Sequence, residues 1–266
     1  MGFEAYARAS GYTDYFGRDE YNNDKDFDGK WAIWDEEFLQ FFANKLSGFK
    51  EPFSTAFFSA TSHHPFVIPK RYEGVFPEGT LPMHRCIRYT DYSLKRFFET
   101  ASQQPWFENT VFVITADHTN QTEIPVYQTT AGIFAVPVIF YHPGSDLKGY
   151  EYAIAQQIDI MPTVLGYLGY DKPYVAFGCD LLTTPAENTF AVNYINGVYQ
   201  YYKNNYLLQF DGNKSIALYD FVQDALLKNN LLDKINDVQP QMETELKAII
   251  QQYMIRMNTD ALVFEE

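Results

Sequence analysis

Apolar positions recur at helical spacing in four stretches of the chain. The first begins at Asp35, where apolar side chains return every three or four residues behind acidic residues that suit the positive end of a helix dipole. Similar apolar stripes predict helices at residues 83–104, 156–168 and 240–257. Pro105 ends the second of these helices, because proline cannot continue a helix.

Continuous apolar runs predict strands between these helices. Residues 53–60 form a short apolar run, which indicates a buried strand. Residues 111–116 are rich in β-branched side chains and indicate a central strand of a parallel sheet, buried on both faces. Residues 136–141 are similar and stop at His142-Pro143-Gly144. Strands that alternate with helices favour a doubly wound α/β fold.

The pattern of apolar and polar residues changes after about residue 187. Short runs of alternating apolar and polar residues follow one another, and Asp211-Gly212 between two of them is a strong turn signal. We predict a small antiparallel sheet followed by the C-terminal helix. The four runs are residues 189–194, 197–202, 205–210 and 215–220.

The chain has 266 residues, enough for one large domain or two small ones with a sizeable core. We expect residues 1–186 to form the C-terminal part of an α/β domain, with residues 187–266 as a small antiparallel β subdomain plus C-terminal helix packed on it. The net charge of −14 argues against nucleic acid and anionic membrane surfaces, since both require a basic footprint. An anionic substrate would therefore need a local positive source, such as a metal ion.

Targeting and redox signals are few. Cys86 and Cys179 are the two cysteines, too few for a disulfide framework. No stretch approaches the roughly 18 apolar residues of a membrane span, and the first residues lack the pattern of a signal peptide. The chain as given is expected to be soluble and to have been cut from something longer.

Asp117 and His118 directly follow the 111–116 run. Ligands of open α/β sheets bind beyond the carboxyl ends of strands. A carboxylate and an imidazole on one tight turn can both bind a divalent metal, with manganese and zinc suited to this pair and magnesium less so. The alternative is an aspartate that caps the turn, with a histidine beside it by chance.

A second candidate follows the 53–60 run, where His63 and His64 stand in a turn before Pro65. One or both could contact an anionic group or a metal. Paired histidines in a turn are about as often structural. Three of the five histidines of the chain lie at these two predicted strand ends, which strengthens both candidates.

A third candidate is a calcium loop. Asp24, Asp26 and Asp28 occupy positions one, three and five of such a loop, and Gly29 occupies position six. Position twelve is Asp35, where this loop normally has a bidentate glutamate. A solvated acidic loop is therefore the favoured interpretation. The sequence has no glycine-rich phosphate loop, G-x-S-x-G, HExxH or C-x-P-x-R motif.

Five segments follow one another in a recognisable order: FFSATSHHPF at residues 57–66, YTDYSL at 89–94, NTVFVITADH at 109–118, VPVIFY at 136–141 and QIDIMPT at 157–163. In this order they resemble lipoteichoic acid synthase-like proteins, a group in the sulfatase-type branch of the alkaline phosphatase superfamily. The resemblance runs through nearly the whole chain. It implies part of an alkaline phosphatase-like doubly wound sheet.

The resemblance also implies a function. It indicates a phosphoglycerol or phosphoethanolamine transferase, or a related phosphodiesterase, that acts on lipid head groups or a glycan outside the cytoplasm. Asp117 and His118 match the family's metal-binding pair, and His63 matches the histidine that contacts the substrate phosphate, with His64 beside it. One divalent metal is implied, together with a threonine nucleophile that attacks phosphorus.

The chain departs from the family in important places. The resemblance implies that the nucleophile, an early acidic metal ligand and a block of membrane helices belong to a first half of the family's proteins, which we expect this chain to lack. Thr119 stands where relatives often have glycine. We therefore expect this chain alone to be catalytically weak and to bind metal poorly. The alternatives are a sulfuric ester hydrolase and a non-catalytic module stabilised by calcium.

Overall fold

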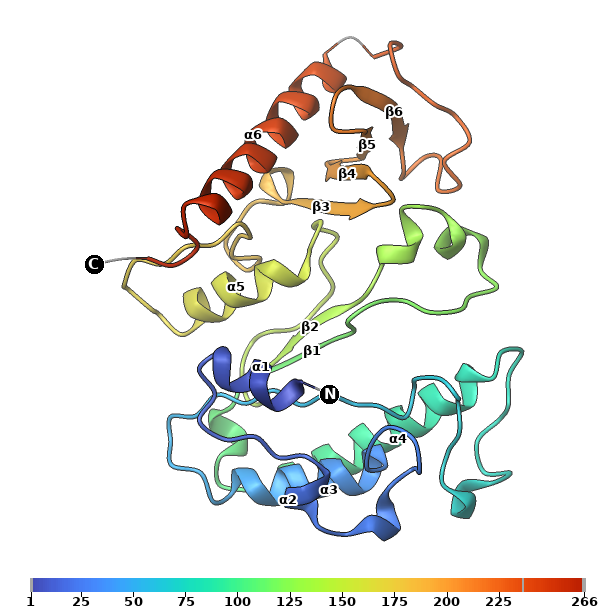
Figure 1. The fold of residues 1–266 in the computed structure, drawn as a ribbon, viewed down its shortest axis with the longest axis vertical. Helices are drawn as coiled ribbons and strands as arrows, with labels where there is room; N and C mark the ends of the chain where they lie inside the picture. The colour runs from blue at the N-terminus through green and yellow to red at the C-terminus, as the bar shows by residue number, and fades with distance from the viewer. Residues whose placement is uncertain (1, 236, 265–266) are drawn as a thin grey trace. The chain divides into compact units, whose positions relative to one another are not determined.

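The computed structural model describes residues 2–235 and 237–264, and its chain divides into two compact units. The first comprises Met1–Thr110 with His142–Gly144, and the second comprises Val111–Tyr141 with Ser145–Glu266 (Figure 1). Each unit is described by itself below. The predicted boundary at residues 186–187 falls inside the second unit, where antiparallel strands begin to follow one another.

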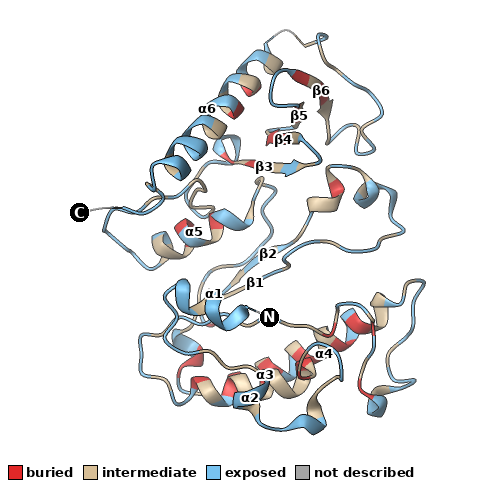
Figure 2. Cartoon of the chain, in the orientation of Figure 1, coloured by how far each residue is buried: buried red, intermediate tan, exposed pale blue. Residues whose placement is uncertain are grey.

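The first unit is built on a pair of helices, α3 (Asp35–Leu46) and α4 (Met83–Ala101). Each helix has its buried residues on one side (Figure 2). The rings of Phe42 and Phe97 stack between the two helices with their centroids 5.8 Å apart. The helices predicted at these positions are confirmed, the second ending three residues early. Around them lie α1 (Phe3–Ala9), α2 (Arg18–Tyr21), η1 (Asp24–Asp26), η2 (Lys70–Tyr72) and η3 (Phe107–Asn109).

Residues 53–60 do not form the buried strand that their apolar pattern predicted. The segment has no ladder partner, and Phe58 is 61% exposed. Phe57 nevertheless packs against rings of α3, including Phe38 at 5.4 Å. An apolar run supplies side chains for a strand but cannot supply the neighbouring backbone that a strand requires. The described part of this unit offers only one isolated β-bridge, between Phe27 and Ile33.

The second unit begins with the two-stranded ribbon β1 (Phe112–Thr115) and β2 (Val138–Tyr141). Both strands lie where the sequence predicted them. The prediction of a parallel strand buried on both faces is wrong, because β1 and β2 are antiparallel and their side chains are half-buried or exposed. Parallel strands require a crossover, usually a helix. The connection here contains only the short turns η4 (Pro125–Gln128) and η5 (Gly132–Phe134).

The small antiparallel sheet predicted after residue 187 is confirmed. Its strands are adjacent in chain order: β3 (Phe190–Ile195), β4 (Val198–Lys203), β5 (Tyr206–Phe210) and β6 (Ser215–Asp220). Asn196-Gly197 joins β3 to β4 with both residues at positive φ, a conformation that asparagine and glycine tolerate. This geometry is typical of a tight hairpin.

The C-terminal helix predicted at residues 240–257 is confirmed as α6 (Val238–Asn258), and it packs against this sheet. Leu246 and Met242 of the helix are almost fully buried. The shared core consists of Tyr201, Leu208, Phe210, Leu218, Met242 and Leu246. No described helix is long and apolar enough to cross a membrane.

A shorter helix, α5 (Ile160–Tyr167), completes the second unit together with the turns η6 (Gln157–Asp159) and η7 (Ala186–Asn188). The helix predicted at residues 156–168 is therefore present, although its first turn is the 3₁₀ turn η6. Asp159 is 1% exposed and accepts hydrogen bonds from the backbone N–H groups of Gln156 and Cys179, at 2.8 Å each. This carboxylate thereby ties the start of α5 to the loop around Cys179.

Candidate functional site

Asp117 and His118 lie on the turn that follows β1, with side chains 62% and 63% exposed. His118 Nδ1 is 2.6 Å from the carbonyl oxygen of Thr119. A carbonyl can only accept a hydrogen bond, so Nδ1 carries the proton, and in the neutral ring Nε2 has a lone pair. Nε2 lies 3.4 Å from Asp117 Oδ2. The backbone N–H of His118 donates to Asp117 Oδ1 at 2.8 Å, which fixes the carboxylate.

This pair fits two neighbouring ligands of one metal ion. Ligand distances of about 2.0–2.2 Å place adjacent donor atoms of a tetrahedral or octahedral ion roughly 3–3.5 Å apart. A metal-binding histidine usually donates its other N–H to a carbonyl or carboxylate, as Nδ1 of His118 does here. Among the described residues no group of three or more His, Cys, Asp or Glu gathers for a metal. At this turn the described residues therefore offer two candidate ligands, Asp117 and His118.

Gln157 of η6 holds the turn that carries this pair. Its side-chain amide donates to the carbonyl oxygens of Ala116 and Asp117, each at 2.9 Å. The sequence placed Gln157 in a family-like segment but assigned it no role. A hydrogen bond between positions 40 residues apart leaves no spacing signal in a single sequence.

His63 and His64 occupy a turn of the first unit and are both exposed. His63 Nδ1 lies 2.9 Å from the carbonyl oxygen of His64, so this nitrogen donates and Nε2 is the one that can face a phosphate oxygen. The edge of the His63 ring contacts Trp31, with the ring centroids 4.7 Å apart. His64 packs against Phe66 at 5.8 Å. The two histidines are thus held by different contacts. In His63 a hydrogen bond at Nδ1 and the contact with Trp31 together fix the direction of Nε2.

Asp35 anchors the histidine turn from α3. It is 1% exposed, and its Oδ1 accepts the backbone N–H groups of Ala60 and Thr61 at 2.9 and 3.1 Å. Its Oδ2 accepts the hydroxyl of Thr90 at 2.7 Å. Three donors compensate this carboxylate for the loss of water. The sequence predicted Asp35 as an acidic residue at a helix start and as position twelve of the calcium alternative, since neither its burial nor its distant partners are visible in the pattern.

The three aspartates of the calcium alternative make separate interactions. Asp24 pairs with Arg18 at 2.8 Å, and Asp26 accepts the Tyr21 hydroxyl at 2.6 Å. Asp28 Oδ1 accepts three backbone N–H groups of residues 30–32. Each carboxylate is therefore engaged without a shared ion, and the geometry gives the calcium interpretation no support.

Comparisons with known proteins find similarity to lipoteichoic acid synthases. A lipoteichoic acid synthase-like protein of Bacillus subtilis, YvgJ, is 29% identical over 223 residues, which cover 72% of this chain and 36% of the relative. Lipoteichoic acid synthase of Staphylococcus aureus is 25% identical, with 82% of this chain and 40% of the relative covered. The chain thus spans between a third and two fifths of the length of these two relatives.

Solved structures show the same fold. The lipoteichoic acid synthase LtaP of Listeria monocytogenes superposes with a TM-score of 0.76 at 21% identity, covering 96% of this chain and 66% of that one. An alkaline phosphatase superfamily protein of Vibrio parahaemolyticus gives a TM-score of 0.65 at 24% identity, covering 82% and 57%. The fold is therefore of the alkaline phosphatase-like α/β class. Within that class, the model of the sulfatase family matches residues 2–170, and the chain belongs to this family.

Proposed function

We propose that this chain is the metal-binding part of a phosphoglycerol- or phosphoethanolamine-type transferase or phosphodiesterase. The observation that carries the proposal is the turn after β1, where Nε2 of His118 and Oδ2 of Asp117 lie 3.4 Å apart with Nδ1 committed to a carbonyl. Similarity to lipoteichoic acid synthases supports this reaction class. The substrates we propose are an anionic phospholipid head group and a glycan or water acceptor.

The residues present take defined parts in this proposal. Asp117 and His118 would hold a divalent ion, which supplies positive charge for phosphoryl oxygens and lowers the pKa of a bound hydroxyl. Manganese and zinc suit this pair better than magnesium. Nε2 of His63 would donate to a phosphate oxygen when protonated. We expect no nucleophile among these residues, so the chain alone should be a weak catalyst.

The location proposed for the reaction is the outer face of the cytoplasmic membrane or the periplasm. This rests on the similarity to lipoteichoic acid synthases and on no segment of this chain. The acidic net charge makes direct binding to an anionic bilayer surface unfavourable. A membrane contact would therefore come through other segments.

A binding measurement tests the proposal without requiring turnover. Manganese should broaden the phosphorus NMR signal of glycerol 1-phosphate in the presence of the chain, beyond the broadening by manganese alone at the same concentrations. Asp117→Ala and His118→Ala should remove the extra effect, and Asp171→Ala, at an exposed acid, should retain it. The proposal fails if all four proteins behave alike. Turnover of a phosphodiester at the rate of a full-length relative would contradict the expected incompleteness.

A sulfuric ester hydrolase is the second candidate. The family model and structural neighbours named as sulfatases support it. Inorganic sulfate and phosphate can be compared directly as competitors of glycerol 1-phosphate in the same assay. Stronger competition by sulfate would favour this candidate, whereas stronger competition by phosphate favours the transferase.

A further inference from the structure

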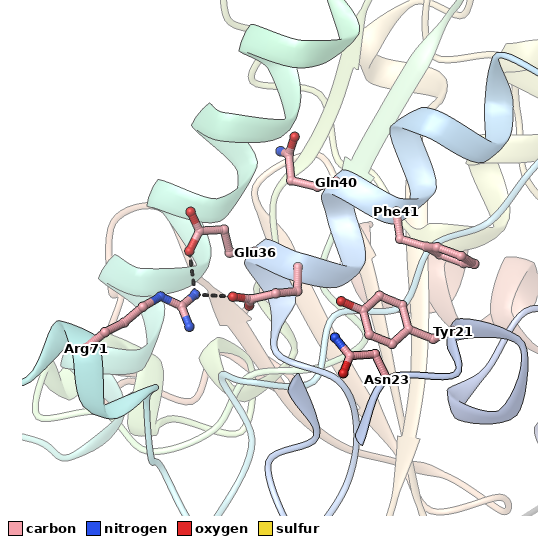
Figure 3. A pocket seen from close by; sticks show the side chains of 7 residues that line it. Tyr21, Asn23, Glu36, Gln40, Phe41 and Arg71 are labelled. Atoms are coloured by element: carbon pink, nitrogen blue, oxygen red, sulfur yellow. Dashed lines mark hydrogen bonds and ion pairs between the residues drawn. The ribbon is translucent and has the colours of Figure 1, made fainter. Parts of the chain in front are cut away.

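A hollow of about 550 Å³ lies on the first unit, and none of its lining residues is one of the candidates named above for metal or phosphate (Figure 3). Binding sites for small molecules typically have about 300–1,000 Å³. Its walls combine two aromatic rings with amide, carboxylate and guanidinium groups. The lining residues are Tyr21, Asn23, Glu36, Glu37, Gln40, Phe41 and Arg71.

Two hydrogen-bonding atoms at this hollow have no partner among the described residues. They are the acceptor Oε2 of Glu37 and the donor Nε2 of Gln40. The other ends of both side chains are engaged, since Glu37 Oε1 accepts from Arg71 and Gln40 Oε1 accepts the Thr100 hydroxyl at 2.6 Å. A buried polar atom without a partner costs free energy, so a ligand that satisfies both atoms would gain affinity. Both atoms are buried, so a ligand reaches them only after the soft terminal torsions of the two side chains turn.

The charges at the hollow select against ionic ligands. The single guanidinium, Arg71, already contacts Glu36 at 2.7 Å and Glu37, so it has little positive charge to offer an anion. A phosphate would also face both carboxylates. A quaternary ammonium would meet Arg71 and leave the Gln40 donor unsatisfied. Burial raises the pKa of Glu37, so this carboxylate gains from a neutral hydrogen-bond donor as well.

A hydroxyl group donates and accepts, and adjacent hydroxyls can therefore satisfy Glu37 and Gln40 together. The rings of Tyr21 and Phe41, in an edge contact with centroids 5.2 Å apart, supply an apolar wall beside these polar groups. A pyranose ring has both a hydroxyl edge and an apolar C–H face. We propose that this hollow binds a neutral hexopyranosyl unit, with its hydroxyls on Glu37 and Gln40 and its apolar face on the aromatic wall.

Titration of the isotope-labelled chain with methyl β-D-glucopyranoside tests this directly. We expect saturable shifts of the side-chain amide NMR signals of Gln40 and Asn23 at millimolar glucoside, without added metal. Glycerol has hydroxyls but no ring face and should bind about tenfold more weakly, a loss typical of one or two contacts. Inorganic phosphate and tetramethylammonium should give no saturable shift. No saturation with the glucoside, or equal binding of either ion, would overturn the proposal.

Amino-acid substitutions distinguish glucoside binding at this hollow from non-specific binding elsewhere on the chain. Gln40→Ala should weaken glucoside binding about tenfold, because it removes a donor. Gln251→Ala, which changes an exposed glutamine on α6, should leave it unchanged. Asn23→Ala, at an exposed position of the lining, serves if Gln40→Ala fails to fold, and it should weaken binding as well. Equal affinities of the lining variant and Gln251→Ala would overturn the assignment. Since metal is absent throughout, failure here is distinct from failure of the proposed reaction.

Discussion

At the scale of single residues, buried carboxylates do most to shape the candidate sites. Asp35 and Asp159 are each 1% exposed, and each accepts backbone N–H groups from a distant loop. Neither is expected to contact substrate or metal. They hold in place the segments that carry His63 and Gln157, and this role follows from their hydrogen bonds alone.

Removal of the Asp35 carboxylate should therefore destabilise the first unit. Asp35→Ala leaves two backbone N–H groups and the Thr90 hydroxyl without their acceptor, and we expect a loss of about 3 kcal/mol in the free energy of unfolding. Urea denaturation measures it. Asp19→Ala, at an exposed acid in the first turn of α2, should stay within about 0.5 kcal/mol of the wild type. Equal losses in the two variants would show that burial of Asp35 contributes nothing.

The thiol of Cys86 should be unreactive in the folded chain. It is 0% exposed, and burial raises its pKa to about 11, so the nucleophilic thiolate is scarce at neutral pH. Burial also raises the pKa of Cys179, which is partly exposed. With a colorimetric disulfide reagent we expect one slow reaction, from Cys179, and rapid reaction of both thiols in denaturant. Cys179→Ser should abolish the reaction of the folded chain, and a fast second thiol would contradict the burial of Cys86.

At the scale of elements, the turn after β1 depends on a side chain from η6. Gln157→Glu replaces the amide donor by a carboxylate that repels the carbonyls of Ala116 and Asp117. We expect faster hydrogen exchange of the backbone amides of His118 and Thr119, measured by NMR. Gln251→Ala is the matched control on an exposed helix face. Unchanged exchange in Gln157→Glu would mean that the turn is held by other contacts.

Packing of α6 on the small sheet gives a second test at this scale. Leu246 is 0% exposed in the core that the helix shares with β4, β5 and β6, whereas Met254 of the same helix is 47% exposed. Leu246→Ala should cost about 2–5 kcal/mol of unfolding free energy, and Met254→Ala under about 1 kcal/mol. Calorimetry of the two variants measures both losses of unfolding free energy. Similar costs would contradict the assigned helix face.

Elements that form through interactions between residues close in sequence were predictable from the sequence. Elements that depend on pairing with a distant segment were not. The hairpins around Asn196-Gly197 and Asp211-Gly212 form because turn residues and alternation act within a few positions. The helices α3, α4 and α6 likewise follow their apolar spacing. Residues 53–60 and the direction of β2 required knowledge of which backbone lies alongside, and both predictions failed.

The residues of the candidate site also divide into those that the sequence could predict and those that it could not. Asp117, His118 and His63 stood out because they follow apolar runs and match a family order. Asp35 and Gln157 could not be found, since their roles arise from hydrogen bonds to carbonyl and amide groups 25 to 41 positions away. The two orphaned atoms at the hollow of the first unit are equally invisible in the sequence.

At the scale of the whole molecule, the chain is a sulfatase-family protein that spans 36% and 40% of the two lipoteichoic acid synthase relatives described above. The two residues proposed to bind a metal and the histidine turn proposed to contact a phosphate belong to separate compact units. Metal binding by Asp117 and His118 is therefore the claim on which the functional account depends.

Paramagnetic broadening by manganese tests that claim most directly, because it detects weak binding. In a titration of the chain, the ring signals of His118 should broaden at the lowest manganese concentration among the five histidines. Asp117→Ala should require at least about tenfold more metal for the same broadening, and Asp171→Ala should require no more than the wild type. Equal broadening of all histidine rings, or an unchanged titration in Asp117→Ala, would contradict the account.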